Sequence, residues 1–236
     1  MAAVSEEAPF RGVVFDLDGT LVDTLDEITA GLNAGLASVK VGPHPRESVR
    51  GWVGDGVAAL VARALPGAPP ELVKEVRGRV LDAYSEGVGL LSRVYPGVPQ
   101  CLESLRLDGL RLAVLTNKPH ELATALVEHF FPEIFEVVHG VREGAAQKPD
   151  PEPLLEVSAK LGLEVNEILV VGDSGVDIQT AANAGARVAA VTWGFRARAE
   201  LVALGPDWLV DRAEEIVAAV RSSREAPATA RMVLDE

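Results

Sequence analysis

Residues 12–23 of the chain read GVVFDLDGTLVD. The first four residues of this stretch are apolar, as is typical of a short strand buried on both faces of a sheet. The segment that follows contains aspartate and glycine, which favour turns. The stretch therefore predicts a buried strand over residues 12–15 that ends in a polar loop carrying Asp16 and Asp18.

Four further apolar runs of similar length follow along the chain. They cover residues 110–115 (LRLAVL), 134–138 (IFEVV), 167–171 (EILVV) and 187–191 (RVAAV). Apolar residues recur at helical spacing between them, as at Leu154, Val157 and Leu161. Strands that alternate with helices predict an α/β fold with a doubly wound parallel sheet and right-handed crossovers.

One long gap interrupts this alternation. Roughly ninety residues separate the first predicted strand from the second, and the segment between them shows helical patterns such as Leu72, Val76 and Val80. We interpret residues 23–91 as a small helical cap inserted into an α/β core formed by residues 1–22 and 92–222. Residues 223–236 have little apolar patterning and are predicted to form a flexible tail.

The composition narrows the class of protein. Acidic residues outnumber lysine and arginine by 35 to 22, and the net charge of −13 disfavours nucleic acid as a partner, because polyanion binding requires cations. The apolar runs are too short to span a membrane, and Ser5, Glu6 and Glu7 interrupt any N-terminal signal sequence. We therefore expect a soluble, cytoplasmic protein, either a monomer or a homodimer. Its single cysteine, Cys101, is predicted to be buried on an apolar helical face.

Residues suited to phosphate chemistry follow the predicted strands. In chain order they are Asp16, Asp18, Gly19, Thr20, Thr116, Asn117, Lys118, Lys148, Asp173 and Asp177. Open α/β sheets place their sites at the carboxyl ends of their strands. We therefore expect these residues to converge on one crevice.

This set of side chains suits the hydrolysis of a phosphate monoester. A carboxylate that attacks phosphate is repelled by about 4 kcal/mol per charge pair at about 4 Å and an effective dielectric of about 20. A divalent metal removes this repulsion, and Mg²⁺ prefers carboxylate oxygens, so Asp16 and Asp173 are candidate ligands. Asp16 is the candidate nucleophile, and Asp18 is the candidate general acid and base. Thr116 and Lys148 are candidates for binding the phosphoryl oxygens.

Four segments of the chain resemble, in order and spacing, the four motifs of the haloacid dehalogenase superfamily. They are residues 15–23 (FDLDGTLVD), 116–119 (TNKP), 148–154 (KPDPEPL) and 171–177 (VGDSGVD). Within the superfamily these segments are most similar to those of phosphoglycolate phosphatases. The resemblance implies a Rossmann-like core, a cap and an aspartyl-phosphate intermediate on Asp16. It also implies a small phosphorylated metabolite as substrate, with 2-phosphoglycolate as the best candidate.

The resemblance further implies roles for the other residues of the site. Mg²⁺ is expected to bind Asp16, the backbone carbonyl of Asp18 and Asp173, with Asp177 supporting the site without direct contact. Thr116 and Lys148 are expected to hold the phosphate. The remaining contacts to substrate in the core are expected from Gly19, Thr20, Asn117 and Lys118.

The predicted cap contains a glycine-rich segment, residues 50–56 (RGWVGDG). Its three glycines suit a tight loop between helices, and one interpretation is a simple connection without substrate contact. The other rests on resemblance to the cap loop of phosphoglycolate phosphatases, in which the loop closes over the site and selects the leaving group. Arg50 is then expected to pair with a carboxylate of the substrate, and Arg46 and Lys118 are competing candidates.

Other functions stay open at this point. A phosphomutase similar to β-phosphoglucomutase would share the aspartyl-phosphate, and relatives with similar motifs hydrolyse pyrophosphate, nucleotides or sugar phosphates. Mutases of the superfamily commonly carry a different residue where Thr20 stands, and dehalogenases usually lack the aspartate corresponding to Asp18. A binding module without activity would tolerate the loss of a motif residue, and none is lost. The sequence therefore favours a phosphatase.

Overall fold

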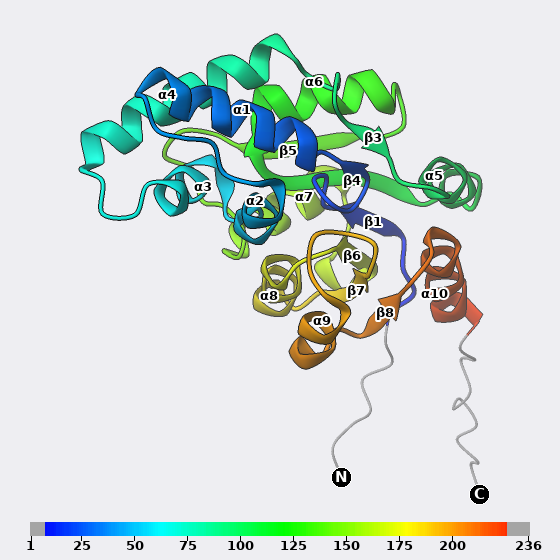
Figure 1. Ribbon diagram of the computed structural model, residues 1–236. Helices are drawn as coiled ribbons and strands as arrows, with labels where there is room; N and C mark the ends of the chain where they lie inside the picture. The colour runs from blue at the N-terminus through cyan, green and yellow to red at the C-terminus, as the bar shows by residue number, and fades with distance from the viewer. Residues whose placement is uncertain (1–7, 226–236) are drawn as a thin grey trace, which may run out of the picture.

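The computed structural model describes residues 8–225 and centres on one large sheet (Figure 1). The sheet has six strands in the order β5-β4-β1-β6-β7-β8, and each neighbouring pair is parallel. The strands are β1 (Gly12–Phe15), β4 (Arg111–Pro119), β5 (Val137–Val141), β6 (Ile168–Gly172), β7 (Arg187–Val191) and β8 (Trp208–Val210). The chain builds the sheet outward from β1 in both directions, so the predicted doubly wound parallel sheet is confirmed.

Helices cover both faces of the sheet. One face packs against α5 (Val98–Leu107), α6 (His120–Phe130) and α10 (Ala213–Glu225), and the other against α7 (Glu152–Leu161), α8 (Gly175–Ala184) and α9 (Arg198–Leu204). A short 3₁₀ helix, η1 (Val165–Glu167), precedes β6.

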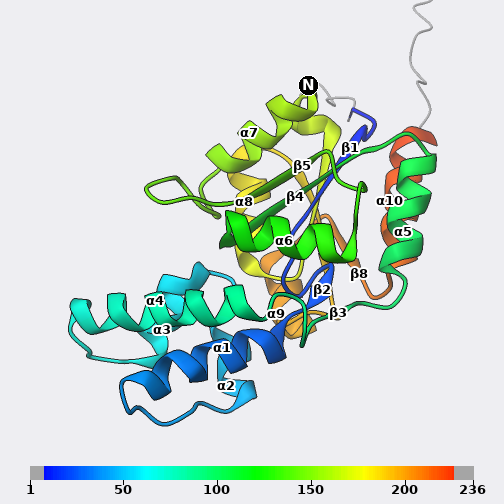
Figure 2. The same ribbon diagram turned by 90° about the horizontal axis from the view of Figure 1, so that it is seen from above.

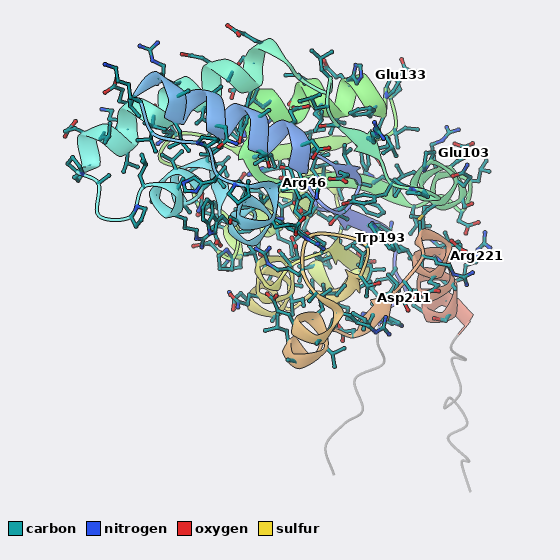
Figure 3. All side chains as sticks on the ribbon, in the orientation of Figure 1. Arg46, Glu103, Glu133, Trp193, Asp211 and Arg221 are labelled. Atoms are coloured by element: carbon teal, nitrogen blue, oxygen red, sulfur yellow. The ribbon has the colours of Figure 1, made fainter. Side chains whose placement is uncertain are left out.

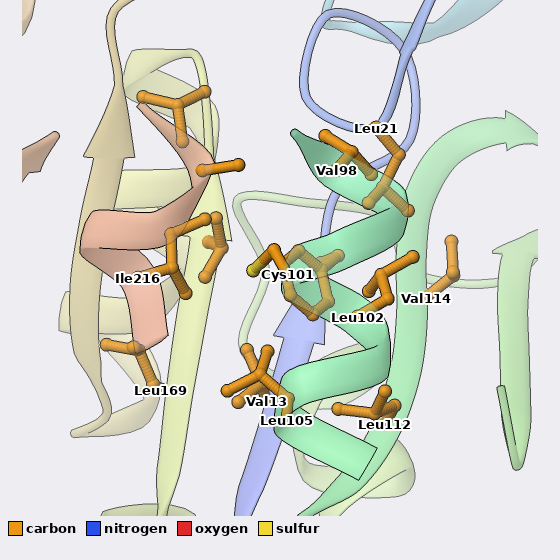
Figure 4. Packing of buried hydrophobic residues seen from close by; sticks show 14 of the residues in the cluster. Val13, Leu21, Val98, Cys101, Leu102, Leu105, Leu112, Val114, Leu169 and Ile216 are labelled. Carbon is orange, nitrogen blue, oxygen red and sulfur yellow. The ribbon is translucent and has the colours of Figure 1, made fainter. Parts of the chain in front are cut away.

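Side chains of β1 alternate between these two layers. Val13 and Phe15 pack in the cluster with α5, whereas Val14 packs in the cluster with α7. Figure 4 shows the first cluster, in which Cys101 of α5 is buried, as predicted. Burial on both faces explains why the strands are continuous apolar runs in the sequence.

Four helices form a group of their own beside the sheet (Figure 2). They are α1 (Leu25–Ser38), α2 (Arg46–Trp52), α3 (Gly56–Ala64) and α4 (Pro70–Glu86). Glycines let α1 approach α4 closely, because a Cβ on Gly31 would lie 2.2 Å from the ring of Tyr84 and a Cβ on Gly35 would lie 2.5 Å from Val80. The inserted helical region is therefore confirmed, and we call these four helices the cap.

The two segments that connect the cap to the core pair with each other. β2 (Val22–Asp23) and β3 (Arg93–Val94) form a small antiparallel sheet. Beside it the buried carboxylate of Glu27 accepts hydrogen bonds from the backbone N–H of Gly89 (2.9 Å) and the hydroxyl of Ser92 (2.7 Å). The predicted domain boundaries at 22/23 and 91/92 fall at this pair of strands, and we retain them as a proposal.

Two predicted strands have other boundaries in the structure. The third covers Val137–Val141 rather than residues 134–138, because Ile134 and Phe135 pack onto the core cluster in the turn after α6. The second extends to Pro119, with a register irregularity after Leu115. Thr116 to Lys118 therefore lie within β4 and not in a loop after it, because the strand pairs with β5 beyond the apolar run.

Other elements were not predicted at all. β2, β3 and β8 are two or three residues long, which is too short for a periodic pattern. α10 reaches Glu225, so residues 223–225 are helical and the prediction of a tail from 223 was wrong there. The rest of that predicted tail, residues 226–236, lies outside the described residues.

Charged side chains are prominent on the outer surface (Figure 3). Arg46 of α2 pairs with Asp26 of α1 (2.5 Å), and Arg221 of α10 pairs with Asp108 (2.7 Å). Exposed pairs of this kind contribute about 0–1 kcal/mol each, so stability depends mainly on the apolar clusters. Between residues 8 and 225, none of the helices is long and apolar enough to cross a bilayer.

Candidate active site

A cavity lies between the cap and the carboxyl ends of β1, β4 and β6. It encloses about 50 Å³, which is room for roughly four water-sized groups. Its core side is lined by predicted site residues, namely Asp16, Asp18, Thr116, Asn117, Lys118, Lys148 and Asp173. Parallel strands that end at one edge of the sheet bring these distant positions together.

Lys148 lies at the centre of the polar floor of the cavity. Its Nζ atom donates to Oδ1 of Asp16 (2.8 Å) and to Oδ1 of Asp177 (2.6 Å), and its side chain is only 4% exposed. Burial alone would lower the pKa of Lys148, but the two carboxylates outweigh burial and raise the pKa above its ordinary value. Lys148 is therefore a buried, charged donor beside the predicted nucleophile.

The carboxylates of Asp16 and Asp173 are both buried at strand ends. Burial raises the pKa of Asp16 to about 7, against the lowering effect of Lys148. Burial also raises the pKa of Asp173 well above its usual range, although Oδ2 of Asp173 accepts the backbone N–H of Phe195 (2.6 Å). These shifts show that the charged forms of the two carboxylates need more positive charge than the protein groups supply.

Asp177 has a different environment in the first turn of α8. Its Oδ2 atom accepts hydrogen bonds from the backbone N–H (3.1 Å) and the hydroxyl (2.6 Å) of Ser174, which caps the helix. Its Oδ1 atom accepts from Lys148. Both carboxylate oxygens therefore have protein donors, which fits a supporting role.

The three carboxylates form a group that suits a divalent cation. Ligand oxygens of Asp16, Asp173 and Asp177 lie within 4.8 Å of one another. The donors are all carboxylate oxygens, the type that Mg²⁺ prefers. Burial raises the pKa values of Asp16 and Asp173, and a cation bound between these carboxylates would counteract that effect by stabilising their charged forms. The residues present therefore fit the predicted metal.

Asp18 lies in the loop between β1 and β2, ahead of the cap. Its Oδ1 atom accepts hydrogen bonds from the hydroxyl of Thr24 (2.7 Å) and from Nζ of Lys118 (3.1 Å). Nζ of Lys118 also lies 5.7 Å from the centre of the Tyr84 ring. The predicted general acid and base is therefore held in place beside a cation that lines the same cavity.

Asn117 joins the cap to the core. Its Nδ2 atom donates to the carbonyls of Gly54 and Lys148, each at 2.9 Å. Gly54 belongs to the cap segment 50–56, and Val53 and Gly56 of the same segment also line the cavity. In this structure the cap segment thus lies over the site and is not a remote connection.

Three residues predicted to contact substrate lie outside the described lining of the cavity, and two of them are in the loop after β1. Gly19 has φ of +90°, and a Cβ there would lie 2.4 Å from Oδ2 of Asp173, so only glycine fits. Thr20 is buried, and its carbonyl accepts the indole N–H of Trp193 (3.0 Å). Gly19 and Thr20 therefore pack against Asp173 and Trp193 and stabilise the loop that carries Asp16 and Asp18.

Arg50 is the third of these residues. Its guanidinium donates to the backbone carbonyls of Phe195 (2.9 Å) and Gly194 (3.1 Å) in the core. Arg46, the other cap arginine considered, pairs with surface carboxylates. Of the three cations considered for a substrate carboxylate, Lys118 is the one that lines the described cavity.

Part of the lining was not predicted from the sequence. The residues concerned are Ile28, Val57, Leu60, Tyr84, Phe195 and Arg196. The last two follow β7, so the same strand-end rule that identified the other residues also points to them. The other four come from cap helices, and no motif marks them because only packing of the cap over the core brings them to the site.

Comparisons with known proteins agree with this geometry. The chain matches the model of the haloacid dehalogenase-like hydrolase family over residues 13–191. It is 37% identical over 215 residues to a phosphoglycolate phosphatase of Haemophilus influenzae (strain 86-028NP), an alignment covering 86% of this chain and 94% of the relative. A plasmid phosphoglycolate phosphatase of Cupriavidus necator is 38% identical over 234 residues, covering 97% of this chain and all of the relative.

A solved structure is similar as well. The crystal structure of a predicted phosphoglycolate phosphatase from Haemophilus somnus superimposes with a TM-score of 0.83 at 30% identity, covering 92% of this chain and 99% of that one. The matched residues 13–191 include the carboxylates, Lys148 and the whole cap. The chain therefore belongs to the haloacid dehalogenase-like hydrolase family.

Proposed function

We propose that this protein is a magnesium-dependent phosphatase that hydrolyses a small phosphomonoester, with 2-phosphoglycolate as the best candidate. The observation that carries the proposal is the buried pair of Lys148 and Asp16, joined at 2.8 Å among three clustered carboxylates. Such a site can bind a phosphoryl group and present a carboxylate to it. The names of the relatives support the substrate.

The first step transfers the phosphoryl group to the protein. An oxygen of Asp16 forms a bond to phosphorus as the bond between phosphorus and the ester oxygen breaks. Asp18 donates its proton to the departing oxygen, which leaves as an alcohol. Lys148 and Thr116 hold the phosphoryl oxygens during transfer. A divalent cation held by Asp16 and Asp173 supplies charge that offsets repulsion between the carboxylate and the phosphoryl group.

The second step releases phosphate. Asp18, now ionised, accepts a proton from a water molecule as the water oxygen attacks phosphorus. The bond between phosphorus and Asp16 breaks, and Asp16 returns to its carboxylate form. Each cycle thus consumes one water and yields one alcohol and one inorganic phosphate. Asp18 ends the cycle protonated, ready for the next substrate.

A cation in the lining of the cavity, Lys118, supports an acidic leaving group. In 2-phosphoglycolate the carboxylate is one carbon from the ester oxygen. Lys118 lies 3.1 Å from Asp18, the group proposed to protonate that oxygen, so Lys118 is within reach of such a carboxylate.

The test is release of inorganic phosphate from 2-phosphoglycolate with Mg²⁺ and with a chelator. We expect Mg²⁺-dependent turnover that Asp16→Asn abolishes without unfolding the protein. Conversion of a sugar 1-phosphate to its 6-phosphate, without net phosphate release, would instead identify a phosphomutase. Faster hydrolysis of pyrophosphate, nucleotides or larger sugar phosphates would keep the reaction type and overturn the proposed substrate.

A further inference from the structure

One arginine of the cap donates hydrogen bonds to backbone carbonyls of the core, and one arginine of the core donates to backbone carbonyls of the cap. From the cap, Arg50 donates to the carbonyls of Gly194 (3.1 Å) and Phe195 (2.9 Å). From the core, Arg196 donates to the carbonyl of Arg50 (3.0 Å) and to that of Val53. We call this reciprocal arrangement of Arg50 and Arg196 the arginine clasp.

The core segment held by the clasp also contacts a predicted metal ligand. The backbone N–H of Phe195 donates to Oδ2 of Asp173 at 2.6 Å, while the carbonyl of the same residue accepts from Arg50. The Phe195 side chain is buried in the apolar cluster of the cap. One residue therefore bonds to Asp173 with its N–H and to the cap with its carbonyl and its ring.

There is little space for this segment to move independently of Asp173. A Cβ on Gly194 would lie 2.3 Å from the Cβ of Asp173 and 2.5 Å from the carbonyl oxygen of Gly19. The backbone at Gly194 is thus packed directly against the carboxylate-bearing residue. Because well-packed contacts do not deform continuously, a displacement of the segment also displaces Asp173 or breaks its hydrogen bond.

We propose that Arg50 is a positioning residue whose clasp on Gly194 and Phe195 holds the Phe195 N–H on Asp173, so that closure of the cap orients this carboxylate for metal binding. This goes beyond the proposed substrate, since the clasp acts on the core backbone. A guanidinium suits the task because it presents several donors in a fixed plane, whereas an ammonium is a single point of charge.

The decisive variant is Arg50→Met, with Arg46→Met as its matched control. Arg46 lies on the same helix with a side chain 42% exposed, against 40% for Arg50, and its ion pairs are to Asp23, Asp26 and Glu47. Hydrogen exchange at the Phe195 amide needs neither metal nor substrate. We expect exchange about tenfold faster in Arg50→Met and unchanged in Arg46→Met.

The second readout is Mg²⁺ affinity, measured by calorimetry on the intact protein. Loss of a group that supports a metal ligand typically weakens binding about 10- to 100-fold, and we expect the lower end for Arg50→Met. We expect Arg50→Lys to fall between Arg50→Met and the unaltered protein, because lysine restores a charged donor. If Arg50→Met unfolds, Arg50→Lys serves for both measurements.

Several results would overturn the proposal. One is a folded Arg50→Met protein with unchanged Phe195 exchange and Mg²⁺ affinity, which would leave the clasp a purely structural contact. Another is a KM that rises for 2-phosphoglycolate but not for p-nitrophenyl phosphate, which would make Arg50 a substrate ligand. Failure to hydrolyse 2-phosphoglycolate would refute the proposed substrate but not the clasp, since amide exchange still reports on it.

Discussion

The Nζ atom of Lys148 lies 2.8 Å from Oδ1 of Asp16, although the two residues are 132 positions apart in the chain. Both are buried, and Asp177 shares the lysine at 2.6 Å. A buried carboxylate is tolerated only when a cation or several donors compensate its charge. Lys148, the group proposed to bind the phosphate, therefore lowers the pKa of the predicted nucleophile but offsets only part of the effect of burial, which raises that pKa to about 7.

Lys148→Met removes the compensating charge from Asp16 and Asp177. Breaking a buried ion pair from one side typically costs about 3–5 kcal/mol, so we expect the free energy of unfolding in chelator to fall by about that amount. Mg²⁺ is expected to restore part of the loss by neutralising the same carboxylates. Urea unfolding with and without Mg²⁺ measures both effects, and equal losses in the two conditions would argue against a metal in this cluster.

Lys118→Met tests the proposed contact to the substrate carboxylate. We expect kcat/KM for 2-phosphoglycolate to fall about tenfold or more relative to that for ethyl phosphate, which lacks the carboxylate, since a charged hydrogen bond contributes roughly 1.5–3 kcal/mol. Steady-state kinetics on both esters provides the comparison. An equal fall in kcat/KM for both esters would show that Lys118 acts only through its contact with Asp18 and does not bind the substrate carboxylate.

A pair of glycine substitutions tests the packing of α1 on α4. Gly31→Ala places a methyl group 2.2 Å from the ring of Tyr84, so we expect destabilisation of about 1–3 kcal/mol despite the higher helix propensity of alanine. In α4, nothing lies within 4 Å of a Cβ on Gly78, and there we expect alanine to stabilise by about 1 kcal/mol. Thermal unfolding of the two variants distinguishes the steric clash at Gly31 from the effect of helix propensity at Gly78. Equal changes in Tm for the two variants would contradict the predicted clash.

The thiol of Cys101 is expected to be unreactive in the folded protein. Burial raises its pKa to about 12, so the thiolate is scarce at pH 8. We expect reaction with a disulfide reagent to be about a thousandfold slower in the native state than in guanidinium chloride. The folded pKa is the higher one, so Cys101 makes folding less favourable as pH rises above its unfolded value near 8.5. Fast native labelling at pH 8 would show that the α5 cluster opens readily.

Much of the core and its chemistry was predictable because it depends on local sequence. The continuous apolar runs predicted strands buried on both faces, and the polar residues after them predicted where the site lies. Asp16, Lys148 and Asp173 were found this way, and the structure brings them together as expected. Short elements such as β8 escaped prediction, because three residues carry no periodicity.

The sequence by itself determined the parallel sheet, the inserted helices and the identity of the charged groups at the strand ends, because these follow from hydrophobic pattern and residue type. Only the tertiary structure decided which groups face the cavity. Arg50 was one of three candidates for pairing with a substrate carboxylate, and in the structure its guanidinium donates to the backbone at Gly194 and Phe195. Tyr84 lines the site although no motif marks it. The physical reason is that cap packing is set by contacts between residues far apart in the chain, and no local pattern encodes them.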